Sequence, residues 1–106
     1  MGANTPEEIE SGVKELLPAI LQANGLTTDE VISVLLTCTK DLNAAFPAAF
    51  AREIGFGAVP LLCAVEMDVP GAMPLVIRVM LHAELPDTAN HVYLRGAAAL
   101  RRDLAQ

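Results

Sequence analysis

Two charged side chains interrupt apolar runs of this sequence, and they are the residues best suited to chemistry. Glu66 follows the run 61–65, and Arg78 lies inside the run 76–81. A guanidinium in a buried strand is costly unless it is paired and hydrogen-bonded. Arg78 therefore lies on an exposed strand face, pairs with Glu66 for structural reasons, or forms with Glu66 two walls of a polar pocket.

Four further side chains complete a set that suits a small, multiply charged organic anion: Arg52, Cys63, Tyr93 and Arg101. Three of them also have structural interpretations, with Cys63 as a core residue, Tyr93 as a half-buried one and Arg52 on a solvated helix face. Cys63 and Glu66 differ by three positions, so strand alternation sends them to opposite faces unless the chain bends beside Glu66.

Other chemistries lack the residues that they need. His82 and His91 have no metal-ligand spacing with Cys38 and Cys63, so we expect no metal site. The sequence has no glycine-rich phosphate loop, Ser-His-Asp set or close carboxylate dyad. The set around Arg78 is thus suited to binding an anion without proton or nucleophile chemistry.

Composition and charge narrow the class of protein. The 106 residues predict one domain, 1–106, and the net charge of −6 argues against a nucleic-acid or anionic-membrane partner. All five arginines fall within 42–106, so an anionic ligand is expected there. The hydrophobic share of 53% exceeds the usual ~45–50% and predicts contact between copies of the chain. No apolar run is long enough to span a membrane, and two reduced cysteines favour a cytoplasmic location.

Helices and strands must position these residues. Thr5-Pro6-Glu7-Glu8 is a capping box, and apolar residues at helical spacing predict a helix over 6–24 that ends at Gly25. We expect strands at 31–39, covered on both faces, at 59–65 and at 75–83, with a second helix over 46–54. Residues 92–94 are a candidate short strand and 95–101 a helical turn or two. This order predicts an α+β fold, a two-layer α/β sandwich with a mixed sheet packed by helices.

Four blocks in series carry a family resemblance: AFPA, C-x-x-E-M-D-V-x-G, IRVM and HVYL. They lie within TKDLNAAFPAAFAREIG, VPLLCAVEMDVPG, IRVML and HVYLRGAAALRRDL, and keep the order of the AroH-type chorismate mutases over most of the chain, from Thr5 to Leu104. The sequence resembles this trimeric α/β class rather than the all-helical class. The resemblance implies a homotrimer in which each active site lies between two subunits.

The resemblance also implies roles for the residues. Such enzymes convert chorismate to prephenate by a concerted rearrangement, without a cofactor. Arg78 would stabilise the negative charge that develops on the ether oxygen, and Glu66 would accept a hydrogen bond from the ring hydroxyl, near Cys63. The implied substrate-binding and pocket-lining residues are Arg52, Tyr93, Phe46, Ala48, Leu61, Leu62 and Arg101.

One part of the family pattern has no counterpart here. The family begins with an R-G-x-R-G-A-type strand whose second arginine reaches the substrate, and this chain has no arginine before Arg52. The sequence therefore predicts an active or weakened chorismate mutase. A non-catalytic protein that binds a chorismate-like acid is the second hypothesis, and a small trimeric enamine/imine deaminase is the third.

Overall fold

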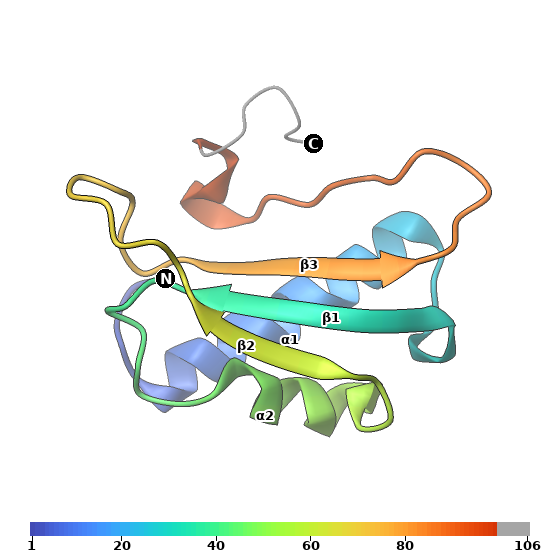
Figure 1. The fold of residues 1–106 in the computed structure, drawn as a ribbon, viewed down its shortest axis with the longest axis horizontal. Coiled ribbons are helices and arrows are strands. Elements are labelled where there is room, and N and C mark those ends of the chain that lie inside the picture. The colour runs from blue at the N-terminus through green and yellow to red at the C-terminus, as the bar shows by residue number, and fades with distance from the viewer. Residues whose placement is uncertain (100–106) are drawn as a thin grey trace.

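The computed structural model describes residues 1–99, in which helices lie against one face of a three-stranded mixed sheet (Figure 1). The strand order is β2-β1-β3; β2 runs parallel and β3 antiparallel to β1. The main elements are α1 (Pro6–Asn24), β1 (Val31–Cys38), α2 (Pro47–Ala51), β2 (Leu61–Val65) and β3 (Ile77–Ala83). The α+β prediction is confirmed.

Helix α1 forms where the capping signals predict it. Thr5 accepts a hydrogen bond from the backbone N–H of Glu8 at 3.1 Å, and Gly25 ends the helix at a φ of 64°. The apolar stripe of the helix is buried at Ile9, Val13 and Leu17. Among the described helices, none combines the length and the apolar character needed to cross a membrane.

The strands pack on the helices through one face only. Val34 and Leu36 of β1 are buried in the core with Ala51 and Phe56 from the α2 region. The prediction that this strand is covered on both faces is wrong for the described chain, because the alternate positions lie on a face with no helix over it. Met80, the partner of Leu35 on that face, is 60% exposed.

Several predicted boundaries also need correction. The strands are shorter than the predicted 31–39, 59–65 and 75–83, because pairing with β1 sets their ends. The predicted helix over 46–54 begins at Pro47, and its α-helical part gives way to the wider turn Arg52–Phe56, where Gly55 has a φ of 102°. Residues 92–94 form no strand, whereas Arg95–Ala99 is a 3₁₀ helix as expected for a helical turn.

Candidate active site

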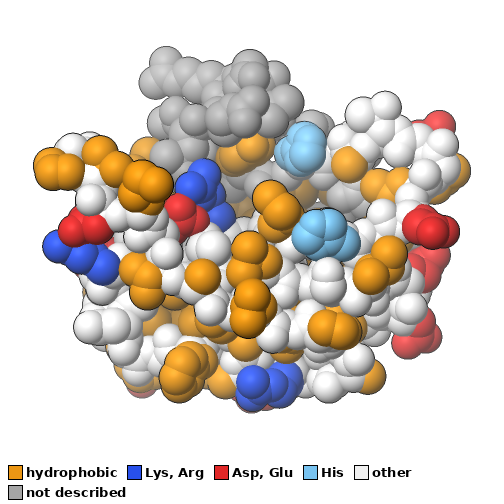
Figure 2. Space-filling view, in the orientation of Figure 1, with side chains coloured by type: hydrophobic (Ala, Val, Ile, Leu, Met, Phe, Trp, Pro, Cys, Tyr) orange, Lys and Arg blue, Asp and Glu red, His pale blue; other side chains and the backbone are white. Residues whose placement is uncertain are grey.

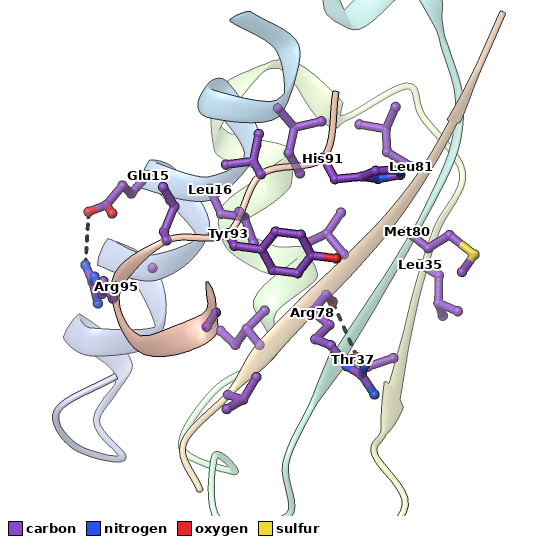
Figure 3. A pocket seen from close by; sticks show the side chains of 18 of the residues that line it. Glu15, Leu16, Leu35, Thr37, Arg78, Met80, Leu81, His91, Tyr93 and Arg95 are labelled. Carbon is purple, nitrogen blue, oxygen red and sulfur yellow. Dashed lines mark hydrogen bonds and ion pairs between the residues drawn. The ribbon is translucent and has the colours of Figure 1, made fainter. Parts of the chain in front are cut away.

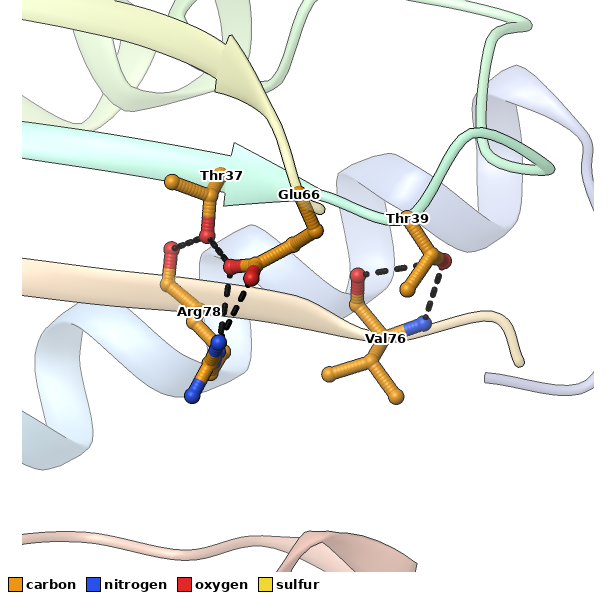
Figure 4. A network of polar contacts seen from close by, with 5 residues as sticks. All are labelled: Thr37, Thr39, Glu66, Val76 and Arg78. Carbon is orange, nitrogen blue, oxygen red and sulfur yellow. Dashed lines mark hydrogen bonds and ion pairs between the residues drawn. The ribbon is translucent and has the colours of Figure 1, made fainter. Parts of the chain in front are cut away.

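Glu66 and Arg78 form a two-point ion pair on the uncovered face of the sheet (Figure 4). The Arg78 Nη2 atom lies 2.5 Å from Glu66 Oε1, and Arg78 Nε donates to Glu66 Oε2 at 3.0 Å. The Arg78 side chain is 58% exposed, whereas that of Glu66 is 17% exposed. The guanidinium end of the pair is therefore open to water, whereas the carboxylate end is largely enclosed.

Thr37 lies between the two charged residues. Its hydroxyl donates to Glu66 Oε2 and also lies 3.4 Å from the backbone carbonyl oxygen of Arg78 (Figure 4). Thr37 and Arg78 are direct partners across β1 and β3. The carboxylate therefore has three polar hydrogens directed at its two oxygens.

The strand order explains why this network forms. Beyond β2, the backbone N–H of Glu66 donates to the carbonyl oxygen of Cys38 at 2.8 Å, which extends the parallel pairing by one residue. The Glu66 side chain then reaches from the β2 edge across β1, over Thr37, to Arg78 on β3. The network thus takes one side chain each from β1, from β3 and from the residue that follows β2.

The contacts shift the pKa values of both charged groups. The hydrogen bond from Arg78, followed by the one from Thr37, holds the pKa of Glu66 below its ordinary value. The same hydrogen bond raises the pKa of Arg78, and Tyr93 contributes in the same direction. The pair is therefore charged on both sides at neutral pH.

A cavity of about 750 Å³ adjoins the network, between α1, β3 and the segment that carries Tyr93 (Figure 3). Its lining includes Thr37, Glu66 and Arg78 together with apolar side chains such as Leu16. The Tyr93 ring lies in this cavity with its hydroxyl directed toward β3 (Figure 3). The cavity therefore combines an apolar wall with one charged, hydrogen-bonded corner, as small-molecule sites do.

The segment around Tyr93 is attached to α1 on both sides of that residue. Asn24 donates to the carbonyl oxygen of Asn90 at 3.0 Å, and the N–H of Asn90 donates back to Asn24 Oδ1 at 2.7 Å. Beyond Tyr93, the guanidinium of Arg95 lies 3.1 Å from Glu15 (Figure 3). These contacts fix where the tyrosine enters the cavity.

A second polar cluster holds the entry to β3. Both carboxylate oxygens of Asp41 accept from the N–H of Leu75 at 3.1 Å, and Thr39 donates to Asp41 at 2.5 Å. The same Thr39 hydroxyl accepts from the N–H of Val76 at 3.0 Å (Figure 4). Leu75 has a φ of 55°, an uncommon conformation for a residue with a side chain. The cluster stabilises this turn and so fixes the position of Arg78 three residues later.

The remaining predicted site residues are spread over the chain. Cys63 and Leu61 pack against the core on the helix side, so alternation does separate Cys63 from Glu66. Leu62 lies on the uncovered face at 66% exposure. Phe46 and Arg52 are exposed next to and beyond α2, and Ala48 is buried within it. Arg101 lies outside the described residues.

Sequence reasoning missed three polar residues of this region: Thr37, Thr39 and Asp41. A signal for Thr37 was present, because Ser33 and Thr37 fall on the same strand face, opposite Val34 and Leu36. That alternation indicated a face without an apolar cover. Within residues 1–99, no group of three His, Cys, Asp or Glu side chains could hold a metal ion.

Comparisons with known proteins all lead to the same family. The family model described as chorismate mutase type I matches residues 1–104. Chorismate mutase AroH of Thermus thermophilus is 49% identical over 95% of this chain and 86% of that protein. Chorismate mutase AroH of Bacillus subtilis (strain 168) is 42% identical over 96% of this chain and 84% of that protein. A solved chorismate mutase from Clostridium thermocellum is 42% identical, with a TM-score of 0.89 covering 92% of this chain and 90% of that one.

Proposed function

Because this chain belongs to the chorismate mutase type I family, we propose that the Thr37–Glu66–Arg78 network and the adjoining cavity are its active site. The protein is a chorismate mutase, an isomerase that converts chorismate to prephenate in aromatic amino-acid biosynthesis. The observation that carries the proposed site is the ion pair of Glu66 with Arg78 at the wall of the cavity that holds Tyr93.

Arg78 is assigned to the bond that breaks. In the rearrangement the ether C–O bond lengthens, and negative charge develops on its oxygen. A fixed cation there stabilises the transition state more than the ground state, which is what accelerates a reaction. Arg78 has five N–H groups, of which two are directed at Glu66. Three remain for substrate.

Glu66 is assigned to the ring hydroxyl. A carboxylate has about four lone-pair positions, and Arg78 and Thr37 occupy three of them. Two of these contacts are on Oε2, so the free position is on Oε1. A substrate hydroxyl that donates to Oε1 would therefore be held beside the guanidinium. The ring of Tyr93 and the apolar cavity wall would then position the rest of the molecule.

The other implied roles require a second subunit. Arg52 and Phe46 are exposed at the helical layer, whereas the network lies on the uncovered sheet face. We assign substrate binding to Arg52 and Arg101, and pocket lining to Phe46, Ala48, Leu61 and Leu62, as contributions to a site shared between neighbours. The packing of Cys63 against the core favours its interpretation as a small core residue, although contact with the ring hydroxyl stays a prediction.

We propose that three copies assemble through the uncovered sheet face. Hydrophobic side chains gather on this face (Figure 2). Leu62 and Met80 are 66% and 60% exposed there. Exposed apolar side chains that gather on one face are typical of a protein–protein interface. A trimer would bury them and place residues of a neighbour near Arg78.

Assembly can be measured directly. Analytical ultracentrifugation is expected to give a homotrimer at micromolar concentration. Met80→Lys should dissociate it, because a charge would be buried in the interface. Gln22→Lys, on the exposed side of α1, is the matched control and should remain trimeric. A stable monomer of the parent chain would contradict the proposed assembly.

Function is tested by following chorismate loss and prephenate formation with the purified protein. We expect both at equal rates. Binding of chorismate without conversion would instead support the non-catalytic hypothesis, which the comparisons do not favour, nor do they favour the deaminase. We also propose a cytoplasmic location, which is consistent with Cys38 and Cys63 both being free thiols.

A further inference from the structure

We propose that Thr37 is a positioning residue for the mutase reaction: its hydroxyl holds the Glu66 carboxylate in the orientation that both Arg78 and the substrate hydroxyl require. This inference rests on the proposed function of the same site. It starts from the contact between Thr37 Oγ1 and Glu66 Oε2, on the central strand of the sheet.

The position of Thr37 is suited to this role. Glu66 crosses β1 to reach Arg78, and Thr37 is the β1 residue over which it passes. Ala64, the β2 partner of Thr37, has no side-chain hydrogen-bond donor. The Glu66 carboxylate therefore takes a hydroxyl donor from β1 and not from β2. A glutamate has three rotatable side-chain bonds, and Thr37 and Arg78 together hold its end from two sides.

The alternative is that Thr37 has only a structural role, with its hydroxyl hydrogen-bonded to the backbone. Its one proton has two possible acceptors here, the Arg78 carbonyl oxygen at 3.4 Å and the nearer carboxylate of Glu66. A charged acceptor gives the stronger hydrogen bond. The geometry therefore assigns the proton to Glu66, and the carbonyl of Arg78 is a secondary contact.

Loss of this hydroxyl has a defined consequence. One oxygen of Glu66 would lose a donor, and the carboxylate could rotate away from the position in which Oε1 faces the substrate. Thr37 also helps to keep the pKa of Glu66 low, after the larger contribution of Arg78. Its removal would raise that pKa, so the carboxylate would be protonated at a higher pH than in the parent.

The experiment compares Thr37→Val, which keeps the shape but removes the hydroxyl, with Thr37→Ser, which keeps the hydroxyl. Thr37→Val is expected to lower kcat/KM about tenfold, mostly through kcat, as a hydrogen bond to a charged group would. The acid limb of its pH profile should move to higher pH. Thr37→Ser should restore both. Ser33→Ala, which removes a hydroxyl from the same strand face at the Ser33–His82 contact, is the control and should resemble the parent.

A second measurement is independent of turnover. The pKa of Glu66, followed by NMR with selective labelling, should rise in Thr37→Val and not in Thr37→Ser. If Thr37→Val matches the parent in both the pKa and kcat/KM, or if Thr37→Ser is as impaired as Thr37→Val, the proposed role is wrong. If the parent protein lacks mutase activity, the proposed function fails, while the NMR titration still decides whether Thr37 holds Glu66.

Discussion

Replacing Arg78 by alanine is expected to lower kcat/KM by at least a hundredfold. Removal of one preorganised donor to a developing oxyanion costs roughly 10²–10³ in rate, and here a full charge is lost as well. The effect should appear mainly in kcat, because the charge on the ether oxygen develops only in the transition state. Steady-state kinetics with chorismate provide the measurement.

Two controls make the Arg78 result specific. Circular dichroism must show that Arg78→Ala folds, which we expect because the Arg78 side chain is 58% exposed and lies outside the core. Cys63→Ser should be much milder, since Cys63 carries no charge and packs against the core. A folded Arg78→Ala protein with near-parent turnover would show that another group stabilises the transition state.

The second large effect concerns the substrate carboxylates. Chorismate carries two, and with Arg78 assigned to the ether oxygen the remaining cationic candidates are Arg52 and Arg101. We expect that an R-G-x-R-G-A strand joined ahead of Met1 raises kcat/KM roughly tenfold to a hundredfold. A charge-assisted hydrogen bond to a carboxylate is worth roughly 1.5–3 kcal/mol, which corresponds to that range.

The structure indicates where such an extension would lie. The Met1 amino group donates to the carbonyl oxygen of Leu75 at 2.8 Å, just before β3. Among the described residues, β3 pairs only with β1, so its other edge faces the cavity. An added strand could therefore pair with β3 and bring its arginine to the site.

The matched control for this experiment is the same extension with its second arginine replaced by alanine. It separates the charge from the effect of covering the β3 edge, which also leaves fewer backbone groups unpaired. Both proteins and the parent are assayed at equal protein concentration. Equal specificity constants for all three would show that another residue already holds the carboxylate.

Local signals in the sequence were enough for the helices and for the existence of the strands. The Thr5 cap, the apolar stripe of α1 and Gly25 act within a few residues of one another, so they can be recognised without tertiary information. Glu66 and Arg78 could be identified as polar intrusions in apolar runs. Their pairing was one of the alternatives, and the structure confirms the contact.

What the sequence could not give is the arrangement across strands. Thr37 becomes important only because β1 lies between β2 and β3, and that order is a tertiary property. Asp41 likewise acts on Leu75, 34 residues away. The uncovered face was mistaken for a covered one because Ile32 and Leu35, outside the core, are apolar like the buried Leu36. In a single sequence, exposed apolar strand residues resemble core residues.

The passage of Glu66 over Thr37 to Arg78 also has a consequence for how the protein folds. These contacts join residues 29 and 41 positions apart, and they depend on a parallel and an antiparallel pairing with the same strand. Each pairing must overcome the entropy of closing a long loop. A partly folded chain with either edge strand detached lacks the Thr37–Glu66–Arg78 network that we propose as the active site. Catalytic competence should therefore emerge only in the last cooperative step of folding, together with the complete sheet.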